Sequence, residues 1–336
     1  MKLKIIGLSL IIVLMLGGMW ILEAEQFEDN IFRSIVKIRS VIPDGARTAG
    51  LLGTMREGNG VIISADGLIV TTGYLILEAE KIKIDLMNGM SLDGKFVGYD
   101  FDTGFGLLRV KLPESIGPLK LGLSAAVSSM DPILVASYGG KDSARAVFVV
   151  NRRDFAGYWE YLLEDAIYTS PPIRQYGGAA LIGSDGSLLG IGSLFARERV
   201  SGIGVIPANV FIPIDKLKPL LADLDQTGNL VGSSRPWMGL YLNQVQGRVI
   251  VLNTSPGGPA EQAGLTQNDI VLQVRNHNVT DLADFYRKVW ALGRAGVDVP
   301  LKILHGSEVI DLTIHSVNRE QFFNFKPGAL TLLYSD

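Results

Sequence analysis

Cysteine is absent from all 336 residues. This excludes disulfide bonds, thiol nucleophiles and cysteine-ligated metal centres, although it says little about compartment. Histidine is almost as scarce, because residues 1–235 contain none and only His277, His305 and His315 follow. A serine hydroxyl attacks a substrate well only when a neighbouring base, usually an imidazole, takes its proton. A hydrolytic site of that kind is therefore excluded from the first 235 residues.

Strong charge of one sign is also missing. The chain carries 31 basic and 34 acidic side chains, a net charge of −3, so electrostatics gives no reason to expect nucleic-acid binding. The three histidines match no metal-ligand spacing, and we expect them to be exposed loop or strand side chains. We therefore predict no metal and no cofactor.

What the chain does have is hydrophobic residues, 47% of the total, and 39 glycines. It is long enough for about two domains. An apolar run from Ile5 to Leu22, preceded by two lysines and followed by two glutamates, has about the length of a membrane-spanning helix. We predict that residues 1–25 are an uncleaved single-pass anchor that exports the rest of the chain. A cleaved signal peptide is the alternative.

Residues 30–222 consist of short apolar runs separated by turn signals such as Asp66-Gly67, Asn88-Gly89 and Asp185-Gly186. Many short strands at regular spacing are typical of an all-β barrel or sandwich. The segment from Lys81 to Leu86 alternates between polar and apolar residues, which favours a half-buried strand. We expect strands at 34–41, 60–64, 68–72, 81–86 and 106–111, and a helix at 214–224.

Two runs in this segment carry a family resemblance. The run from Gly58 to Thr71 reads Gly-Asn-Gly-Val-Ile-Ile-Ser-Ala-Asp-Gly-Leu-Ile-Val-Thr and resembles the start of the protease domain of the HtrA (DegP/DegS) family. The run from Gly98 to Leu108 is similar to the family's Gly-x-Asp-x-x-Thr-Asp-Leu-Ala-Val-Leu. The resemblance implies a mainly β chain with a trypsin-like double β-barrel, usually assembled as a homotrimer.

The family's catalytic motifs are nevertheless absent. Where the family has Thr-Asn-Asn-His-Val-Val, this chain reads Thr-Thr-Gly-Tyr-Leu-Ile, which puts Tyr74 at the histidine position. Gly104 falls at the aspartate position. Gly177 falls at the serine position, in a segment that is one residue shorter than the family's when counted from Thr169. The resemblance therefore implies a degenerate member without a catalytic residue.

The nearby polar residues are poor replacements for the missing catalytic groups. A phenol such as that of Tyr74 is a poor base at neutral pH, and Ser170 is expected to be a solvated strand-end residue. Asp100 and Asp102 are expected to serve a turn. The backbone amides of 175–178 are a candidate anion-binding turn. An active endopeptidase with a non-standard arrangement of groups remains the alternative.

A polar, glycine-bearing segment at 223–235 indicates a linker, and a second domain at 236–318 follows. Its run from Ser255 to Ile270 resembles the core of a bacterial PDZ domain, with Asn268 in place of the usual glycine. We expect strands at 239–245, 248–252, 270–274, 299–304 and 308–314. Helices are expected at 259–263 and 281–292, the latter with Asp281 or Thr280 as N-cap and Gly293 after its end.

PDZ domains add an extended peptide to the edge of a strand and capture its terminal carboxylate with backbone N–H groups. The resemblance implies that the capturing turn and groove strand are residues 237–242, and that one helix forms the other wall. The candidate peptide-binding residues are Trp237, Met238, Gly239, Leu240, Tyr241, Leu242, Leu282, Phe285 and Val289. Core packing is the alternative for the helix residues, and burial between domains is the alternative for Trp237.

The tail, residues 319–336, has apolar stretches that we expect to dock on the protein. The resemblance and the missing motifs together suggest a membrane-anchored pseudo-protease with its body in the bacterial periplasm. Such a protein would bind peptides or protein C-termini as a scaffold, sensor or chaperone-like factor in envelope protein quality control. A purely structural oligomerisation module is a further alternative.

Overall fold

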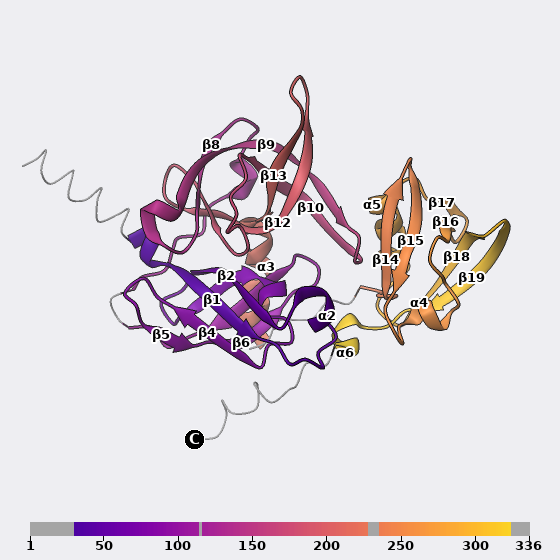
Figure 1. Cartoon of the computed structure of the whole chain (residues 1–336), viewed down its shortest axis with the longest axis horizontal. Helices are drawn as coiled ribbons and strands as arrows, with labels where there is room; N and C mark the ends of the chain where they lie inside the picture. Colours follow the sequence, from indigo (N-terminus) through magenta and orange to yellow (C-terminus); the bar gives the residue numbers. More distant parts are fainter. Residues whose placement is uncertain (1–29, 114–115, 228–234, 324–336) are drawn as a thin grey trace, which may run out of the picture.

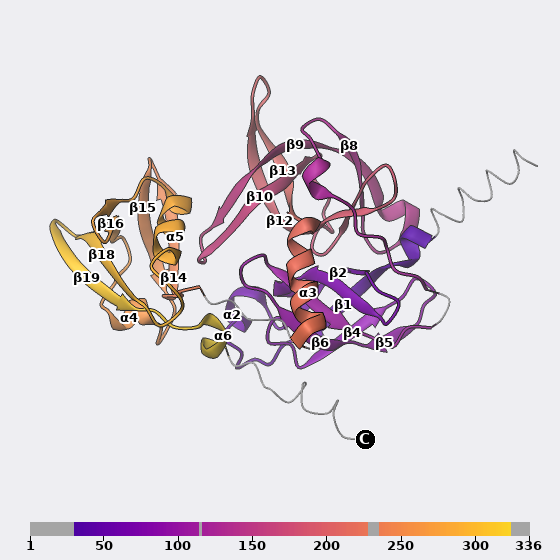
Figure 2. The same ribbon diagram turned by 180° about the vertical axis from the view of Figure 1, so that it is seen from behind.

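The computed structural model describes residues 30–113, 116–227 and 235–323 (Figure 1). Within these ranges no helix is both long and apolar enough to cross a membrane. The predicted anchor, Ile5 to Leu22, lies outside the described residues. The two halves of the first domain and the smaller C-terminal domain appear in succession from indigo to yellow along the sequence (Figures 1 and 2).

The first half is one antiparallel sheet in the order β5-β4-β1-β2-β3-β7-β6. Its edge strands β5 and β6 are separated in sequence only by Gly94, so the chain itself, rather than a hydrogen-bonded ladder, joins the two edges. Our prediction of two barrels is therefore corrected here, since this half is a seven-stranded sheet. Its strands are β1 (Ile35–Val41), β2 (Met55–Ile62), β3 (Leu68–Thr72), β4 (Lys81–Asp85), β5 (Ser91–Asp93), β6 (Lys95–Tyr99) and β7 (Phe105–Arg109).

The second half is a closed barrel in the order β10-β13-β12-β11-β8-β9. Four of its strands have ten or more residues, and β9 and β10 form a hairpin that extends well beyond the barrel wall (Figure 1). Short helices flank the strands: α2 (Ala49–Leu52), η1 (Gly73–Leu75), η2 (Ser124–Ala126), η3 (Gly140–Ser143) and η4 (Ile214–Lys216). The strands are β8 (Pro132–Ala136), β9 (Ala144–Gly157), β10 (Tyr161–Ser170), β11 (Ala180–Ile182), β12 (Leu188–Val200) and β13 (Gly204–Pro213).

The predicted turns are confirmed, because Gly67, Gly89 and Gly186 all have positive φ between paired strands, a conformation that glycine adopts without steric cost. A shared core lies between the sheet and the barrel, where Val61, Phe105 and Leu107 pack with Tyr161 and Ile212. Any cleft along this junction is therefore held by rigid elements on both sides.

Helix α3 (Leu217–Thr227) follows the barrel. It continues five residues into the segment we assigned to the linker, because Leu224 is buried against the shared core. The linker prediction for 223–227 is thus wrong, and 228–234 lie outside the described residues.

The C-terminal domain is a six-stranded sheet with one main helix. Strand β16 matches the prediction, and the side chain of Asp281 accepts a hydrogen bond from the N–H of Asp284, which confirms it as the N-cap of α5. The elements are β14 (Leu240–Val245), β15 (Arg248–Thr254), α4 (Pro259–Gln262), β16 (Ile270–Val274), β17 (His277–Asn278), α5 (Leu282–Trp290), β18 (Asp298–His305), β19 (Glu308–His315) and α6 (Arg319–Phe322).

The start of the tail docks between the domains, as expected. The ring of Phe322 lies 4.5 Å from that of Trp237, and the ring of Phe323 lies 5.8 Å from that of Phe101. The guanidinium of Arg319 lies 4.8 Å above the Phe101 ring. These aromatic and cation–π contacts join α6 to both the first domain and the C-terminal domain.

Candidate functional site

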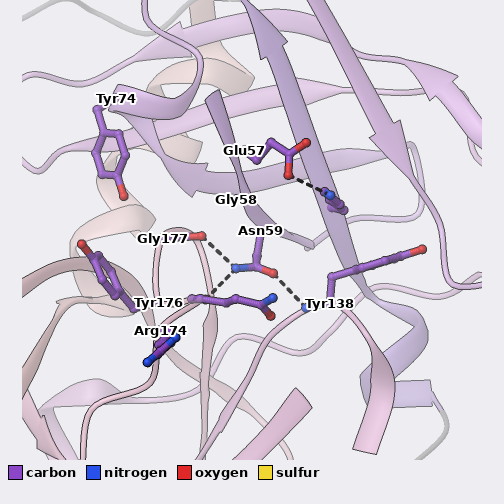
Figure 3. Close-up of a pocket in the computed structure, with 10 residues that line it drawn as sticks. Glu57, Gly58, Asn59, Tyr74, Tyr138, Arg174, Tyr176 and Gly177 are labelled. Carbon is purple, nitrogen blue, oxygen red and sulfur yellow. Dashed lines mark hydrogen bonds and ion pairs between the residues drawn. The ribbon is translucent and has the colours of Figure 1, made fainter. Parts of the chain in front are cut away.

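Two of the three positions that we aligned with the family's triad meet in the structure. A Cβ atom added at Gly177 would lie 2.6 Å from the hydroxyl oxygen of Tyr74. Figure 3 shows the Tyr74 side chain with its hydroxyl directed toward the turn that carries Gly177. Because a base must lie within hydrogen-bond reach of its nucleophile, these positions have the right separation for such a pair but hold a phenol and a glycine.

The turn around Gly177 is held by the side chain of Asn59. Its amide nitrogen donates to the carbonyls of Gln175 (2.8 Å) and Gly177 (2.9 Å), and its oxygen accepts from the N–H of Tyr138 (2.8 Å) (Figure 3). Among the described residues, the N–H groups of Gln175 and Gly177 donate to no acceptor. The turn therefore leaves backbone donors available, which is what an anion-binding turn requires.

The loop that carries Tyr74 is fixed by a buried cation. Arg56 is 4% exposed, and its guanidinium donates to the carbonyls of Gly53, Tyr74 and Leu77 and to the hydroxyl of Thr48. Burial raises the pKa of Tyr74 well above its ordinary value. The phenol therefore stays protonated at neutral pH and does not act as a general base.

The third position, Gly104, is buried and lines a cavity together with Tyr74 and Tyr161. A Cβ atom there would lie 2.9 Å from the hydroxyl oxygen of Tyr161, which donates to the carbonyl of Thr103 (2.6 Å). Asp100 accepts from the N–H of Thr103 (2.9 Å), which confirms its role in a turn. Asp102 instead forms an ion pair with Arg235 (3.1 Å), because Arg235 approaches from the C-terminal domain.

Ser170 lies at the far end of β10, half-buried, and its hydroxyl donates to the carbonyl of Pro207 (3.0 Å). The Pro207 carbonyl is not a base that could take the proton of the Ser170 hydroxyl.

Two cavities adjoin Tyr74. One of about 390 Å³ lies beside Asn59 and Gly177, and one of about 640 Å³ is lined by aromatic side chains that include Phe155, Trp159 and Tyr161. The cleft is thus retained, and its interior is aromatic.

The candidate peptide-binding residues of the C-terminal domain lie on the turn before β14, on β14 and on α5, the elements that border the predicted groove. All except Tyr241 are buried, and Leu240, Leu242, Leu282, Phe285 and Val289 are part of the domain's own core. Trp237 is 4% exposed and contacts the rings of the tail, in line with the alternative of a residue buried between domains.

The groove is already in contact with another part of the chain. The tip of the β9–β10 hairpin reaches β14 and α5, as both views show (Figures 1 and 2). The carboxylate of Glu160, at this tip, accepts hydrogen bonds from the N–H groups of Met238 (3.0 Å) and Leu240 (2.7 Å). These donors belong to the turn that we assigned to carboxylate capture.

Comparisons with known proteins agree with this architecture. Residues 58–191 match the model of the trypsin-like peptidase domain, and residues 236–315 match that of the PDZ domain. The chain therefore combines a trypsin-like peptidase domain with a PDZ domain. It is similar to a probable periplasmic serine endoprotease, DegP-like, of Halomonas elongata (27% identity, covering 76% of this chain and 55% of the relative). It is also similar to the chloroplastic Protease Do-like 1 of Arabidopsis thaliana (26% identity, 77% and 63%).

Solved structures show the same fold. The HtrA-type protease AlgW with a decapeptide superposes with a TM-score of 0.54 at 19% identity, covering 87% of this chain and 98% of AlgW. The serine endoprotease from Yersinia pestis gives a TM-score of 0.53 at 22% identity, covering 87% and 97%. The chain spans 55–63% of the length of the curated relatives named above.

The three histidines lie in the PDZ domain. Nδ1 of His305 lies 2.8 Å from the carboxylate of Asp269, and Nδ1 of His315 lies 2.9 Å from that of Asp298. His277 is exposed in β17. Within the described ranges, no group of three histidine or acidic side chains is arranged to hold a metal.

Sequence reasoning missed Glu160, Tyr161 and Tyr286, which join the hairpin to the cleft and to the PDZ groove. A signal was present, because Glu160 is the one charged residue in the run Gly-Tyr-Trp-Glu-Tyr from Gly157 to Tyr161. A lone carboxylate among aromatic residues at a hairpin tip indicates a contact with donors elsewhere in the fold.

Proposed function

We propose that this HtrA-type protein binds peptides without hydrolysing them. The observation that carries the proposal is the pairing of Tyr74 with Gly177, where the relatives' chemistry needs a base and a nucleophile. A protonated phenol beside a glycine provides neither group. The described fold around the two positions is intact, so the loss concerns the reaction and not the scaffold.

The PDZ domain supports the binding half of the proposal. Its turn at residues 237–240 presents backbone N–H groups to a carboxylate, and strand β14 lies beside it at the groove. These are the two features by which such domains hold a chain terminus. The ligand class that fits is an extended peptide or protein C-terminus, and the nine candidate residues of the groove remain proposals for its binding.

The site of action follows from the relatives and the N-terminal run. The Escherichia coli relative is named periplasmic serine endoprotease DegP, at 24% identity, covering 82% of this chain and 61% of the relative. We propose that the body of this protein lies in the periplasm and that the apolar run from Ile5 to Leu22 anchors it in the inner membrane. A role in envelope protein quality control, as scaffold, sensor or chaperone-like factor, is consistent with that location.

The first prediction tests the chemistry. The purified full-length chain is expected to show no labelling by a serine-reactive fluorophosphonate and no cleavage of denatured casein above the buffer rate. An active DegP-type endopeptidase assayed in parallel is the positive control. Labelling of any residue between 165 and 185, located by mass spectrometry, would contradict the proposal.

A further inference from the structure

The tip of the β9–β10 hairpin places a glutamate where the backbone favours glycine. Tyr158, Trp159 and Glu160 connect the two strands, since Gly157 pairs with Tyr161. Glu160 closes this three-residue connection with φ +54, in the left-handed region that non-glycine residues rarely adopt. It is nevertheless 5% exposed. A strained and buried carboxylate at a hairpin tip needs compensating contacts.

Those contacts come from the PDZ domain's capturing turn. The two carboxylate oxygens of Glu160 accept from the N–H groups of Met238 and Leu240, which flank Gly239. Gly239 has φ +79, so the turn is folded to direct successive N–H groups to one point, as anion-binding turns do. The carboxylate of Glu160 thus occupies the place where a peptide's terminal carboxylate would bind.

The backbone of the tip also makes contacts that a bound peptide would make. The carbonyl of Tyr158, two residues before Glu160, accepts from the N–H of Leu242 in β14 (2.7 Å). The carboxylate of Glu160 at the turn before β14 and the carbonyl of Tyr158 at Leu242 thus contact the same stretch of backbone that an added peptide strand would contact. From the opposite wall, the hydroxyl of Tyr286 in α5 donates to the carbonyl of Gly157 (2.7 Å).

We infer that Glu160 and the hairpin tip are a built-in ligand of the PDZ groove, and that an external peptide C-terminus binds only by displacing them. This inference rests on the proposed peptide-binding function and adds its regulation. Because one turn cannot hold two carboxylates, peptide and hairpin exclude each other. The apparent affinity for peptide is therefore the intrinsic affinity multiplied by the fraction of molecules in which the groove is open.

Polar contacts outside the groove set how firmly the tip is held. Arg287 of α5 forms an ion pair with Asp154 of β9, and Arg319 of α6 donates to the backbone carbonyl of Glu160 (3.3 Å). The side chain of Leu162, next to the tip, packs in the PDZ core. The tip therefore docks as a unit, and its release exposes apolar surface on both domains.

The competition is expected to depend on pH. Burial raises the pKa of Glu160 to about 7, although the N–H groups of residues 238–240 and the charge of Arg319 lower it in part. Besides Arg319, the groups facing Glu160 are the Tyr286 hydroxyl of α5 and the ion pair between Arg235 and Asp102, which line the same small cavity.

The released side chain has an ordinary pKa near 4.5. Docked Glu160 thus binds its proton more tightly than released Glu160, and docking weakens as pH rises from about 4.5 to about 7. The affinity of the wild-type chain for a peptide C-terminus is therefore expected to increase over this range, by up to about tenfold per pH unit. The peptide's own carboxylate, with a pKa near 3.5, stays ionised throughout.

The deciding experiment uses the full-length chain and three fluorescent decapeptides that end in valine, leucine or phenylalanine, each as free acid and as C-terminal amide. Apolar final residues are chosen because the candidate residues Leu240, Phe285 and Val289 are all apolar. Fluorescence anisotropy is measured from pH 5 to 7.5 for wild type, Glu160→Ala and Glu160→Gly. The glycine variant relaxes the backbone at position 160, so it separates loss of the carboxylate from damage to the hairpin. Glu308→Gln, an exposed change on β19, is the control.

Both variants at position 160 are expected to bind the free-acid peptides at least about tenfold more tightly than wild type at pH 5, without the wild-type pH dependence. In wild type, bound peptide should accelerate hydrogen exchange in residues 157–161. Equal affinities for all variants, or unchanged exchange in 157–161 with peptide bound, would overturn the inference. Absence of binding to every variant would overturn the peptide-binding function with it, whereas hydrolysis of a bound peptide would overturn only the non-hydrolytic part of that function.

Discussion

Replacing Arg56 by methionine is expected to lower the free energy of unfolding by at least about 3 kcal/mol, because each buried acceptor left without a donor costs about 1–3 kcal/mol. The methionine fills most of the volume but donates no hydrogen bond. Three carbonyl oxygens, those of Gly53, Tyr74 and Leu77, lose a donor inside the protein. In a domain of this size, a loss of about 3 kcal/mol lowers the unfolding midpoint by roughly 6–12 °C.

Scanning calorimetry of the full-length chain checks this expectation. Arg39→Met is the matched control, because Arg39 forms an ion pair with Asp85 on the surface of the same sheet, and its removal should leave the midpoint unchanged. Equal midpoints for the Arg56 variant and wild type would mean that the loop around Tyr74 is held by packing alone.

The second large effect is a gain of reactivity. The double variant Tyr74→His with Gly177→Ser is expected to be labelled by a serine-reactive fluorophosphonate, whereas Gly177→Ser alone is not. A serine fits at 177, because Tyr74 contributes every atom within 4 Å of the Cβ position. The imidazole is smaller than the phenol and has an ordinary pKa near 6.5, so it can take the serine proton at neutral pH, which the phenol of Tyr74 cannot.

The expected reactivity is partial. No aspartate orients the introduced imidazole, and loss of that carboxylate costs about 10⁴ in rate in serine proteases. Labelling kinetics followed by in-gel fluorescence measure the effect. Tyr138→His with Gly177→Ser, which puts an imidazole on another wall of the same cavity, is the control and should stay unlabelled. Labelling of Gly177→Ser alone at a comparable rate would show that Tyr74 or another group already acts as a base.

Local signals explain what could be predicted from the sequence. Alternation in the segment from Lys81 to Asp85 and the Asp-Gly and Asn-Gly turns specify neighbouring strands, and the structure has them at or near the expected residues. The same holds for the PDZ elements, since β16 and the N-cap Asp281 depend on a few adjacent residues. The meeting of Tyr74 with Gly177, far apart in sequence, followed only from the family resemblance.

The features that could not be predicted depend on contacts between residues far apart in the sequence, which no pattern of neighbouring residues indicates. Strand β9 contains Arg152, Arg153 and Asp154 in succession, so no clean alternation marks it, and its charges are used by partners from other elements. Glu160 bonds to residues 78 and 80 positions away. The seven-stranded sheet of the first half likewise depends on which strands pair at its edges. The residue pattern within each strand does not specify that pairing.

The contact between Tyr161 and Gly104 has a consequence for how this lineage can change. An aspartate at position 104 would place its Cβ 2.9 Å from the Tyr161 hydroxyl and would have to adopt φ +86, so it fits only if Tyr161 is lost. Tyr161 also stacks on Trp159, 5.5 Å away, at the tip that docks on the PDZ domain. Installing an aspartate at position 104 is therefore expected to disturb the contact between the domains, so a carboxylate at this position and the docked hairpin disfavour each other.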